Sequence, residues 1–597
     1  MQIDGSASVT SMQDLQKNVE CTHQVSEYNS TQQSPTPPTH ASSQALTVVL
    51  GGNQPNTPPP SEPPQELQAN DDQRIRPRTE KALILVTLCA CTFLSAMEVT
   101  VTTTSLPTIS KSFTSDAGYS WVGSAYLLAN AAFSSTWGKV SDIWGRKPIV
   151  ILAVSLFAIG SLMAGLSVNL AMLIAARALQ GVGGGGMMVM VNICISDLFS
   201  LRDRAKYLGL TGVVWVVACS VGPIIGGVLT ERISWRWCFF ITLPISCAAI
   251  PALYCFLDLH NPRTPINVGL KAVDWIGSFL VISGTVMLLL GLEFGGLDYA
   301  WTSIQVLILL VFGFATLVGF ILYEWKFSFN PIMPLRLFKH YNNVAALIVC
   351  SSQSSTFVAG IYFLPLYFQA VLGVNPLRSG FYILPFVLTL SVTSALTGIY
   401  VKKTGRNIST IVFGLFFTII GYSLFMDFDL TNHWEKTIIY QIIAGVGVGP
   451  NFQSPLIALQ STTPKKDIAA ATANYNFIRH LSTSSSLILG SLIFQGELRK
   501  RCLAIVSNLG ATAAEALSKS SVGTSIVTIQ NLSSEQQLLA RTAVLASLRI
   551  TWSGYVAYSS LSLLTSLGFS PNRLKQSPVA DTEAVDEKKK DLYLPKS

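Results

Sequence analysis

The chain has 597 residues, of which 50% are hydrophobic and only 12% are Asp, Glu, Lys or Arg, and its mean hydropathy is +0.45. Because soluble domains carry about 25% charged residues, this composition excludes an ordinary soluble enzyme and a disordered regulator. The net charge of +8 is carried by short segments between long charge-free stretches, which argues against a nucleic-acid-binding surface.

Residues 1–80 differ from the rest of the chain, since Ser, Thr, Gln and Pro dominate them. So little apolar surface cannot offset the entropy cost of folding, and we expect a disordered cytoplasmic tail. The segment lacks a basic start followed by an apolar run. We therefore expect no cleaved secretory signal and a first span that acts as its own insertion signal.

Long charge-free apolar stretches follow, and about 18 such residues are enough to cross a bilayer as a helix. Together with the Pro, Gly and charge positions, they predict an all-α polytopic membrane protein. The fourteen predicted spans are 82–106, 118–138, 148–167, 170–195, 207–229, 237–257, 273–293, 303–323, 344–372, 378–400, 408–426, 437–459, 468–494 and 549–570. Two charge-free stretches must contain turns, which we place at Ser167–Asn169 and Gly373–Pro376.

The basic residues between the spans predict the orientation. With the amino terminus inside, the inner loops hold sixteen Lys and Arg and the outer loops hold five, as the positive-inside rule requires. Both termini, including the polar tail 573–597, are then cytoplasmic. The segment 495–548 becomes a long outer loop, in which Asn531 is a candidate glycosylation site.

Ten cysteines and six histidines are present, without a Cys-x-x-Cys pair and without a visible cluster. We therefore expect neither a disulfide framework nor a metal site. Gly183–Gly186 is glycine-rich, but no Gly-Lys-Ser/Thr follows it, so a phosphate-binding loop is not expected. We expect no cofactor, and an ion gradient is the remaining energy source.

A short motif between spans 2 and 3 recurs later in the chain. The first copy holds Gly138, Asp142, Gly145 and Arg146. Asp142 can stabilise a helix amino terminus or pair with a nearby Arg. The second copy, 398–406, keeps the two glycines and the arginine at the same spacing. Internal repetition is typical of secondary transporters and predicts an N-terminal six-helix bundle, a linker with spans 7 and 8, and a C-terminal six-helix bundle, at 81–258, 259–343 and 344–572.

These motifs resemble the major facilitator superfamily, and within it the fungal fourteen-helix drug/proton antiporter branch of multidrug and toxin efflux pumps. The resemblance implies two six-helix bundles plus two extra central spans. It implies a conformational role for the first loop motif and a proton-coupling role for Arg177 in span 4. It also implies an antiporter motif in span 5, formed by Gly212, Gly222, Pro223, Gly226 and Gly227.

Two ionisable residues within the first half are candidates for proton coupling, because charges inside spans are costly and mark function. Glu98 in span 1 stands where the branch usually has Asp, and Arg177 lies at a similar predicted depth in span 4. We expect the two side chains to pair, either as a protonation-linked switch or as a purely structural buried pair. Arg479, which interrupts span 13, would meet an anionic substrate or anchor that span.

Polar side chains near mid-membrane are candidates for the substrate cavity, although each could instead join two helices by a hydrogen bond. They are Asn130, Gln353, Tyr362, Gln369, Asn451, Gln453, Asn474 and Asn476.

The function we expect is proton-coupled export of amphipathic small molecules such as drugs, toxins or fungal secondary metabolites. The alternatives are a proton-coupled importer of iron-chelate (siderophore) complexes on the same fold and a membrane scaffold or sensor that uses the long tail. An enzyme is not expected. The expected partners are the lipid bilayer and a small-molecule substrate, with no nucleic acid, and we expect a monomer. We expect the plasma membrane, with the vacuolar membrane as the alternative.

Overall fold

The computed structural model describes residues 78–113, 117–259, 264–295, 299–328, 330–431, 433–504, 517, 529 and 532–570. Helices make up the fold of these residues, and one isolated bridge joins Gly295 and Tyr299. The predicted all-α class is therefore confirmed. The tail 573–597, nearly all of 1–80 and the candidate glycosylation site Asn531 lie outside the described residues.

The first bundle follows the predicted spans closely. Its helices are α1 (Arg78–Phe113), α2 (Ala117–Trp144), α3 (Arg146–Gly165), α4 (Leu170–Leu198), α5 (Leu201–Arg232), α6 (Trp237–Phe240) and α7 (Thr242–Phe256). The turn predicted at Ser167–Asn169 separates α3 from α4. Asn169 forms the amino-terminal cap of α4, because its Oδ1 accepts a hydrogen bond from the Met172 amide at 2.8 Å.

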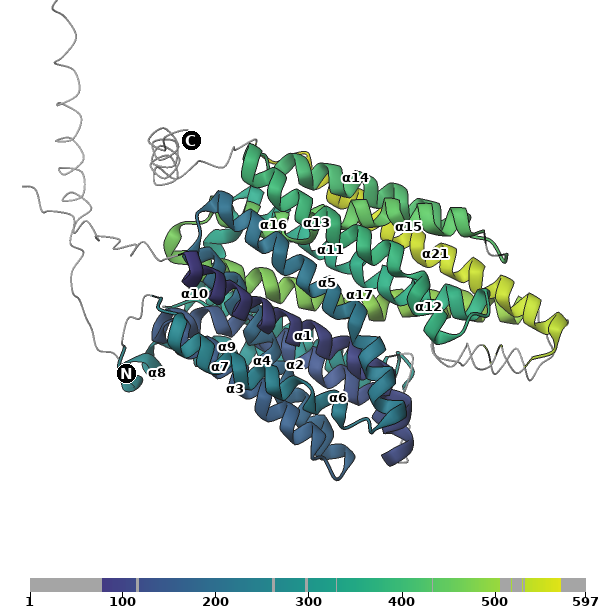
Figure 1. Ribbon diagram of the computed structural model, residues 1–597, viewed down its shortest axis with the longest axis horizontal. Helices are drawn as coiled ribbons and strands as arrows, with labels where there is room; N and C mark the ends of the chain where they lie inside the picture. Colours follow the sequence, from purple (N-terminus) through teal and green to yellow (C-terminus); the bar gives the residue numbers. More distant parts are fainter. Residues whose placement is uncertain are drawn as a thin grey trace, which may run out of the picture. The chain divides into compact units, whose positions relative to one another are not determined.

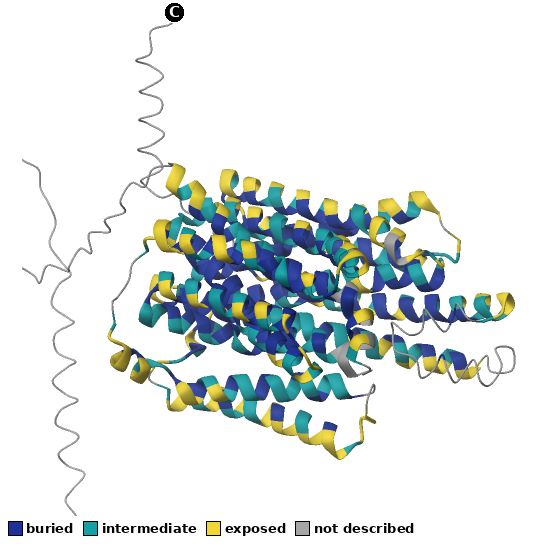
Figure 2. Ribbon diagram, turned by 60° about the horizontal axis from the view of Figure 1, so that its bottom comes forward, coloured by how far each residue is buried: buried dark blue, intermediate teal, exposed yellow. Residues whose placement is uncertain are grey.

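A short central segment connects the two bundles. It contains α8 (Ile266–Ala272), α9 (Trp275–Phe294), α10 (Ile304–Lys326) and the 3-10 helix η1 (Leu335–Lys339). Helix α9 packs on α2, where Trp121 and Phe294 meet edge to face at 5.5 Å. Exposed apolar side chains cover much of α10, and exposed residues lie along the outer helices of the fold (Figure 2). Such a surface suits lipid contact.

The second bundle is more irregular than the first. It comprises α11 (Tyr341–Leu366), the π-helical η2 (Tyr367–Val371), α12 (Pro376–Tyr382), α13 (Leu384–Thr404), α14 (Ile408–Leu424), η3 (Phe425–Asp427), α15 (Trp434–Val448), η4 (Pro450–Phe452), α16 (Ser454–Thr462), η5 (Lys465–Asp467), α17 (Ile468–Ala504) and α21 (Ser534–Ser566). The turn predicted at Gly373–Pro376 is observed, and Gly373 has a positive φ of 69°. Only glycine adopts this conformation without strain.

Eleven helices of the described residues are long and apolar enough to cross a membrane. The other three predicted spans, 2, 13 and 14, coincide with α2, α17 and α21, which form helices of 28, 37 and 33 residues but are not among these eleven. The count of fourteen transmembrane helices therefore stays a prediction. Helices α17 and α21 also continue into the predicted outer loop 495–548, because helix formation tolerates the charged residues that end a hydrocarbon-spanning stretch.

The two bundles meet along α5 and α13 and along α2 and α17. Helix α5 lies against α1 of its own bundle and against α13 of the other (Figure 1). Glycines permit this approach. A Cβ placed on Gly398 of α13 would lie 2.5 Å from the carbonyl oxygen of Ala205, and one on Gly138 of α2 would lie 2.6 Å from the Cβ of Ala473. We call the end of the helices that carries Gly138, Ala205 and Gly398 the Lys402 end.

Candidate functional site

A buried ion pair joins the first and fourth helices. Nη1 of Arg177 on α4 lies 2.5 Å from Oε1 of Glu98 on α1, and the two side chains are 1% and 0% exposed. The structure thus brings together the two residues that the sequence analysis expected to pair. Neither side chain is accessible to water from the surface, so each charge is stabilised by the other and by polar neighbours rather than by hydration.

Arg177 is held from several directions. Its Nη1 also donates to Oε1 of Gln180 at 2.7 Å, and its Nε donates to the carbonyl oxygen of Val122 at 3.0 Å. Its guanidinium lies over the ring of Tyr126, 4.7 Å from the centroid. These contacts fix the arginine on the α2–α4 side of the pair. Gln180 was not among the candidate residues, and its position one helical turn after Arg177 could have indicated it.

The two carboxylate oxygens of Glu98 have different surroundings. Oε1 accepts hydrogen bonds from Arg177 and from Oγ1 of Thr102, the latter at 3.1 Å. Oε2 is buried and has no hydrogen-bond partner among the residues that the structure describes. A buried oxygen without a donor is costly for an ionised carboxylate, whereas a proton on Oε2 would remove the negative charge. The arrangement therefore suits a carboxyl group that gains and loses a proton.

Arg146 organises the first loop motif. Its Nη1 donates to Asp142 and to Ser141, both at 2.7 Å, and its Nε donates to Asp197 at 2.9 Å. Of the two roles considered for Asp142, the structure shows pairing with arginine, and partial burial raises the pKa of that carboxyl above its ordinary value. Gly145, whose φ is 91°, makes the sharp turn between α2 and α3.

The second copy of the motif links the two bundles. Lys402 replaces the acidic residue of the first copy, and its Nζ lies 2.7 Å from Oδ1 of Asp203 on α5. We did not single out Asp203 from the sequence, because its partner lies about two hundred residues away and loop charges indicated only orientation. The pair is partly exposed, with 44% and 33% side-chain exposure. Together with the contact between Gly398 and Ala205, it closes the Lys402 end.

The glycines of the predicted span-5 motif lie in three different environments. Gly222 faces Thr100 of α1 so closely that a side chain on it would collide with Oγ1, and the carbonyl of Gly226 lies near Sγ of Cys238. Gly212 instead faces the other bundle, where Ser394 and Phe452 lie. Gly227 has open space around it. Pro223 lies within α5. Close packing of α5 thus depends on Gly212 and Gly222.

Several of the predicted cavity residues have partners within the protein. Asn476 donates to the Thr472 carbonyl and accepts from Asn192, which joins α17 to α4. Gln369 donates to Ser379 at 3.3 Å. The side-chain amide of Asn451 donates a hydrogen bond to the Ile411 carbonyl and accepts one from the Leu415 amide, both in α14. Tyr362 is 37% exposed and meets Phe363 edge to face. These side chains join helices or lie near the surface.

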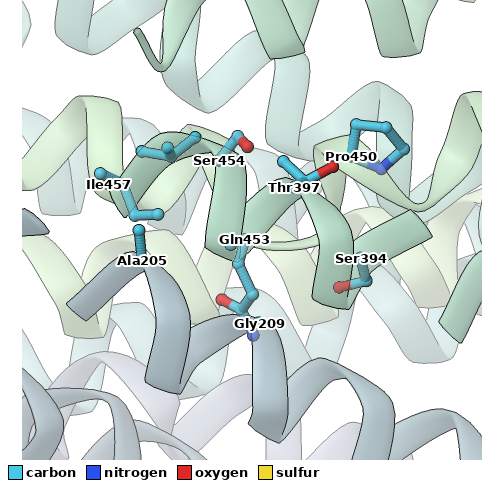
Figure 3. A pocket seen from close by; sticks show the side chains of 10 residues that line it. Ala205, Gly209, Ser394, Thr397, Pro450, Gln453, Ser454 and Ile457 are labelled. Atoms are coloured by element: carbon cyan, nitrogen blue, oxygen red, sulfur yellow. The ribbon is translucent and has the colours of Figure 1, made fainter. Parts of the chain in front are cut away.

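The other predicted cavity residues, Asn130, Gln353, Gln453 and Asn474, are buried and each has at least one polar atom without a partner. Gln453 lines a cavity of about 10 Å³ between α5, α13 and the α15–α16 connection (Figure 3). This volume holds about one water molecule. The cavity lies beside the closed Lys402 end, where Ala205, Ser394 and Gln453 approach one another from both bundles.

The sequence is similar to those of known membrane transporters. The model of the Major Facilitator Superfamily matches residues 88–486. The chain is 45% identical over 515 residues to the efflux pump dotC of Dothistroma septosporum (strain NZE10 / CBS 128990), covering 86% of this chain and 88% of that protein. It is 34% identical to the acurin A biosynthesis cluster MFS-type transporter of Aspergillus aculeatus (strain ATCC 16872 / CBS 172.66 / WB 5094), covering 69% and 74%.

A solved structure shows the same fold. The proton:xylose symporter XylE, with 6-bromo-6-deoxy-D-glucose bound, aligns with a TM-score of 0.54 over 85% of this chain and 99% of that one. The sequences are 12% identical, so this likeness concerns the fold alone.

Proposed function

Because the chain belongs to the Major Facilitator Superfamily of transporters, we propose that it is a proton-coupled exporter of amphipathic small molecules such as drugs, toxins or fungal secondary metabolites. Export is supported by the relative named an efflux pump, and the metabolite class by the relative of a biosynthesis cluster. The plasma membrane is the proposed location, with both termini in the cytoplasm.

The observation that carries proton coupling is the buried Glu98–Arg177 pair. While Glu98 is ionised, the pair attaches α1 to α4. Removing one partner of a buried ion pair costs about 3–5 kcal/mol, because the other charge stays uncompensated. Separation of α1 from Arg177 therefore costs less once a proton neutralises Glu98, because it then leaves one uncompensated charge instead of two, and Oε2 is the atom that would accept the proton. Proton binding and helix movement are coupled in this way.

The closed Lys402 end supplies the second part of the mechanism. In the proposed orientation this end faces the cytoplasm, so the arrangement corresponds to a state that is closed toward the inside. A proton arriving from outside would neutralise Glu98, release Arg177 and favour separation of Lys402 from Asp203 and of Gly398 from Ala205. Proton loss to the cytoplasm and substrate loading would then restore the ion pair and return the substrate outward.

Transport into everted vesicles tests this proposal. The probe is anthraquinone-2-carboxamide, a neutral aromatic molecule whose passive distribution does not follow pH. With the interior two pH units more acidic, each exchanged proton supplies about 2.7 kcal/mol, enough for up to about 100-fold accumulation. We expect accumulation by the wild type and its loss in Glu98→Gln and Arg177→Ala.

The matched control is Glu435→Gln, which removes an exposed carboxylate at the start of α15 and should transport like the wild type. Accumulation that is equal with and without the pH difference would refute proton coupling. Accumulation only when the interior is the more alkaline side would favour the proton-coupled importer instead.

A further inference from the structure

A second buried arginine lies at the interface of the two bundles. Arg479 on α17 is 6% exposed, and its Nη1 is buried without a hydrogen-bond partner in the described part of the chain. The ion pairs that the described residues form involve other side chains, and none includes Arg479. Arg177, in contrast, has a carboxylate, an amide oxygen and a backbone carbonyl as partners.

Aromatic rings from both bundles surround this cation. The Arg479 guanidinium lies 4.2 Å from the ring centroid of Phe452 and 5.6 Å from that of Trp215. Phe357 of α11 meets Phe452 edge to face at 5.7 Å. The negative ring faces partly offset the positive charge, which allows an arginine without a counterion to persist at this depth. They also form flat apolar surfaces beside it.

Trp215 adds a second unused donor. Its Nε1 is buried, and no described residue forms a hydrogen bond with it. Trp215 lies on α5 in the first bundle, and Arg479 lies on α17 in the second. Two N–H donors, one from each bundle, thus lack acceptors in the same aromatic cluster. Because the Arg479 guanidinium lies 5.6 Å from the Trp215 ring centroid, the two donors belong to neighbouring side chains.

The cluster lies deep in the membrane-spanning region. At 1.5 Å per residue, Arg479 is about 16 Å along α17 from its start at Ile468, and Trp215 is about 21 Å along α5 from Leu201. Both helices start at the Lys402 end, so the cluster lies beyond the closed contact. A hydrocarbon core is about 30 Å thick, which places both residues near its middle. Substrate sites of transporters with repeated halves lie at this depth.

We propose that Arg479 and Trp215 bind an anionic oxygen of the transported molecule, with Phe452 and Phe357 contacting its aromatic or apolar body. The ligand class is therefore an amphipathic aromatic acid, carrying an ionised carboxylate or phenolate. This inference rests on the proposed transport function and specifies its substrate. Because the two donors belong to different bundles, the bound anion would also link substrate occupancy to the relative position of the bundles.

Equilibrium dialysis on protein in phosphatidylcholine nanodiscs, without a pH gradient, tests the site. The probes are anthraquinone-2-carboxylate and the neutral anthraquinone-2-carboxamide. Because Arg479→Gln removes a hydrogen bond between two charged groups, we expect it to bind the carboxylate about 10- to 100-fold more weakly than the wild type does. Carboxamide binding should stay within about twofold of the wild type, which also shows that the variant is folded. The affinity of Arg479→Lys for the carboxylate should lie between those of the wild type and Arg479→Gln, because lysine keeps the charge but lacks the planar guanidinium.

Trp215→Phe keeps a ring and removes the N–H group, and we expect about fivefold weaker binding of the carboxylate alone. Arg378→Gln, which removes an exposed arginine, is the matched control and should leave both affinities unchanged. The proposal would be overturned if Arg479→Gln lost affinity equally for both probes, or if the wild type bound the carboxylate no more tightly than the carboxamide.

Failure of this site and failure of proton-coupled export are distinguishable. If the protein binds the carboxylate more tightly than the carboxamide but shows no transport driven by a pH difference, proton-coupled export is refuted and the anion site is supported. Transport of the carboxamide driven by pH without that preference would refute the anion site alone.

Discussion

The contact between Gly398 and Ala205 makes a sharp prediction about how the two bundles separate. A Cβ added at Gly398 would lie 2.5 Å from the Ala205 carbonyl oxygen, whereas ordinary contacts of this kind are 3.4–4 Å. In Gly398→Ala the two helices must therefore move apart by about 1 Å, and overpacking of this kind costs about 1–3 kcal/mol. The contact joins two bundles rather than parts of one, so separation at the Lys402 end relieves the collision.

At about 1.4 kcal/mol per tenfold change, this cost lowers the population closed at the Lys402 end by about 5- to 150-fold. Spin labels at Lys147 in the first bundle and Lys403 in the second would report the change as a longer distance in a double electron–electron resonance experiment. Gly319→Ala is the matched control, because open space surrounds that glycine in α10. An unchanged distance distribution in Gly398→Ala would refute the reasoning.

Two further predictions concern other contacts of α5. Asp203→Asn removes the partly exposed pair with Lys402 and should shift the equilibrium toward the state open at the Lys402 end by about 0.5–1 kcal/mol, seen as more long distances in the same experiment. The exchange Asp203→Lys with Lys402→Asp should restore the wild-type distribution. A double exchange as open as the single variant would show that the pair has no such effect. Gly222→Ala should lower the thermal unfolding temperature, because its methyl group collides with Thr100, and Thr100→Ala in the same chain should recover part of the loss. Equal stability of Gly222→Ala and wild type in a fluorescence-monitored melt would contradict the packing.

The pairing of Glu98 with Arg177 was predictable because depth in a membrane follows directly from position along a helix. Two opposite charges at equal depth in a membrane have few other charged side chains with which to pair. The pairing of Lys402 with Asp203 and the contact of Arg479 with Trp215 were not predictable in this way, since both cross between bundles. Those contacts depend on how the two repeats dock, which the sequence of either repeat does not specify.

The irregular second bundle shows another limit of the sequence. Predicted span 12 is divided into α15, η4 and α16 around Pro450, because proline lacks the amide hydrogen that a continuous helix requires. Proline was present in the sequence, but Pro223 lies within the uninterrupted α5. Whether a proline interrupts a helix depends on the packing of its neighbours. The same packing places Asn451 against α14 rather than in the predicted cavity.

The most direct test of the central claim counts protons when substrate binds. Purified protein in weak buffer with a pH indicator is mixed with anthraquinone-2-carboxamide, which does not itself titrate. If substrate loading and the ionised Glu98–Arg177 pair belong to the same state, the wild type should release up to one proton per bound molecule at a pH where Glu98 of the free protein is protonated, and Glu98→Gln should release none. Equal proton release by both proteins would contradict the assignment of Glu98 as the coupling group.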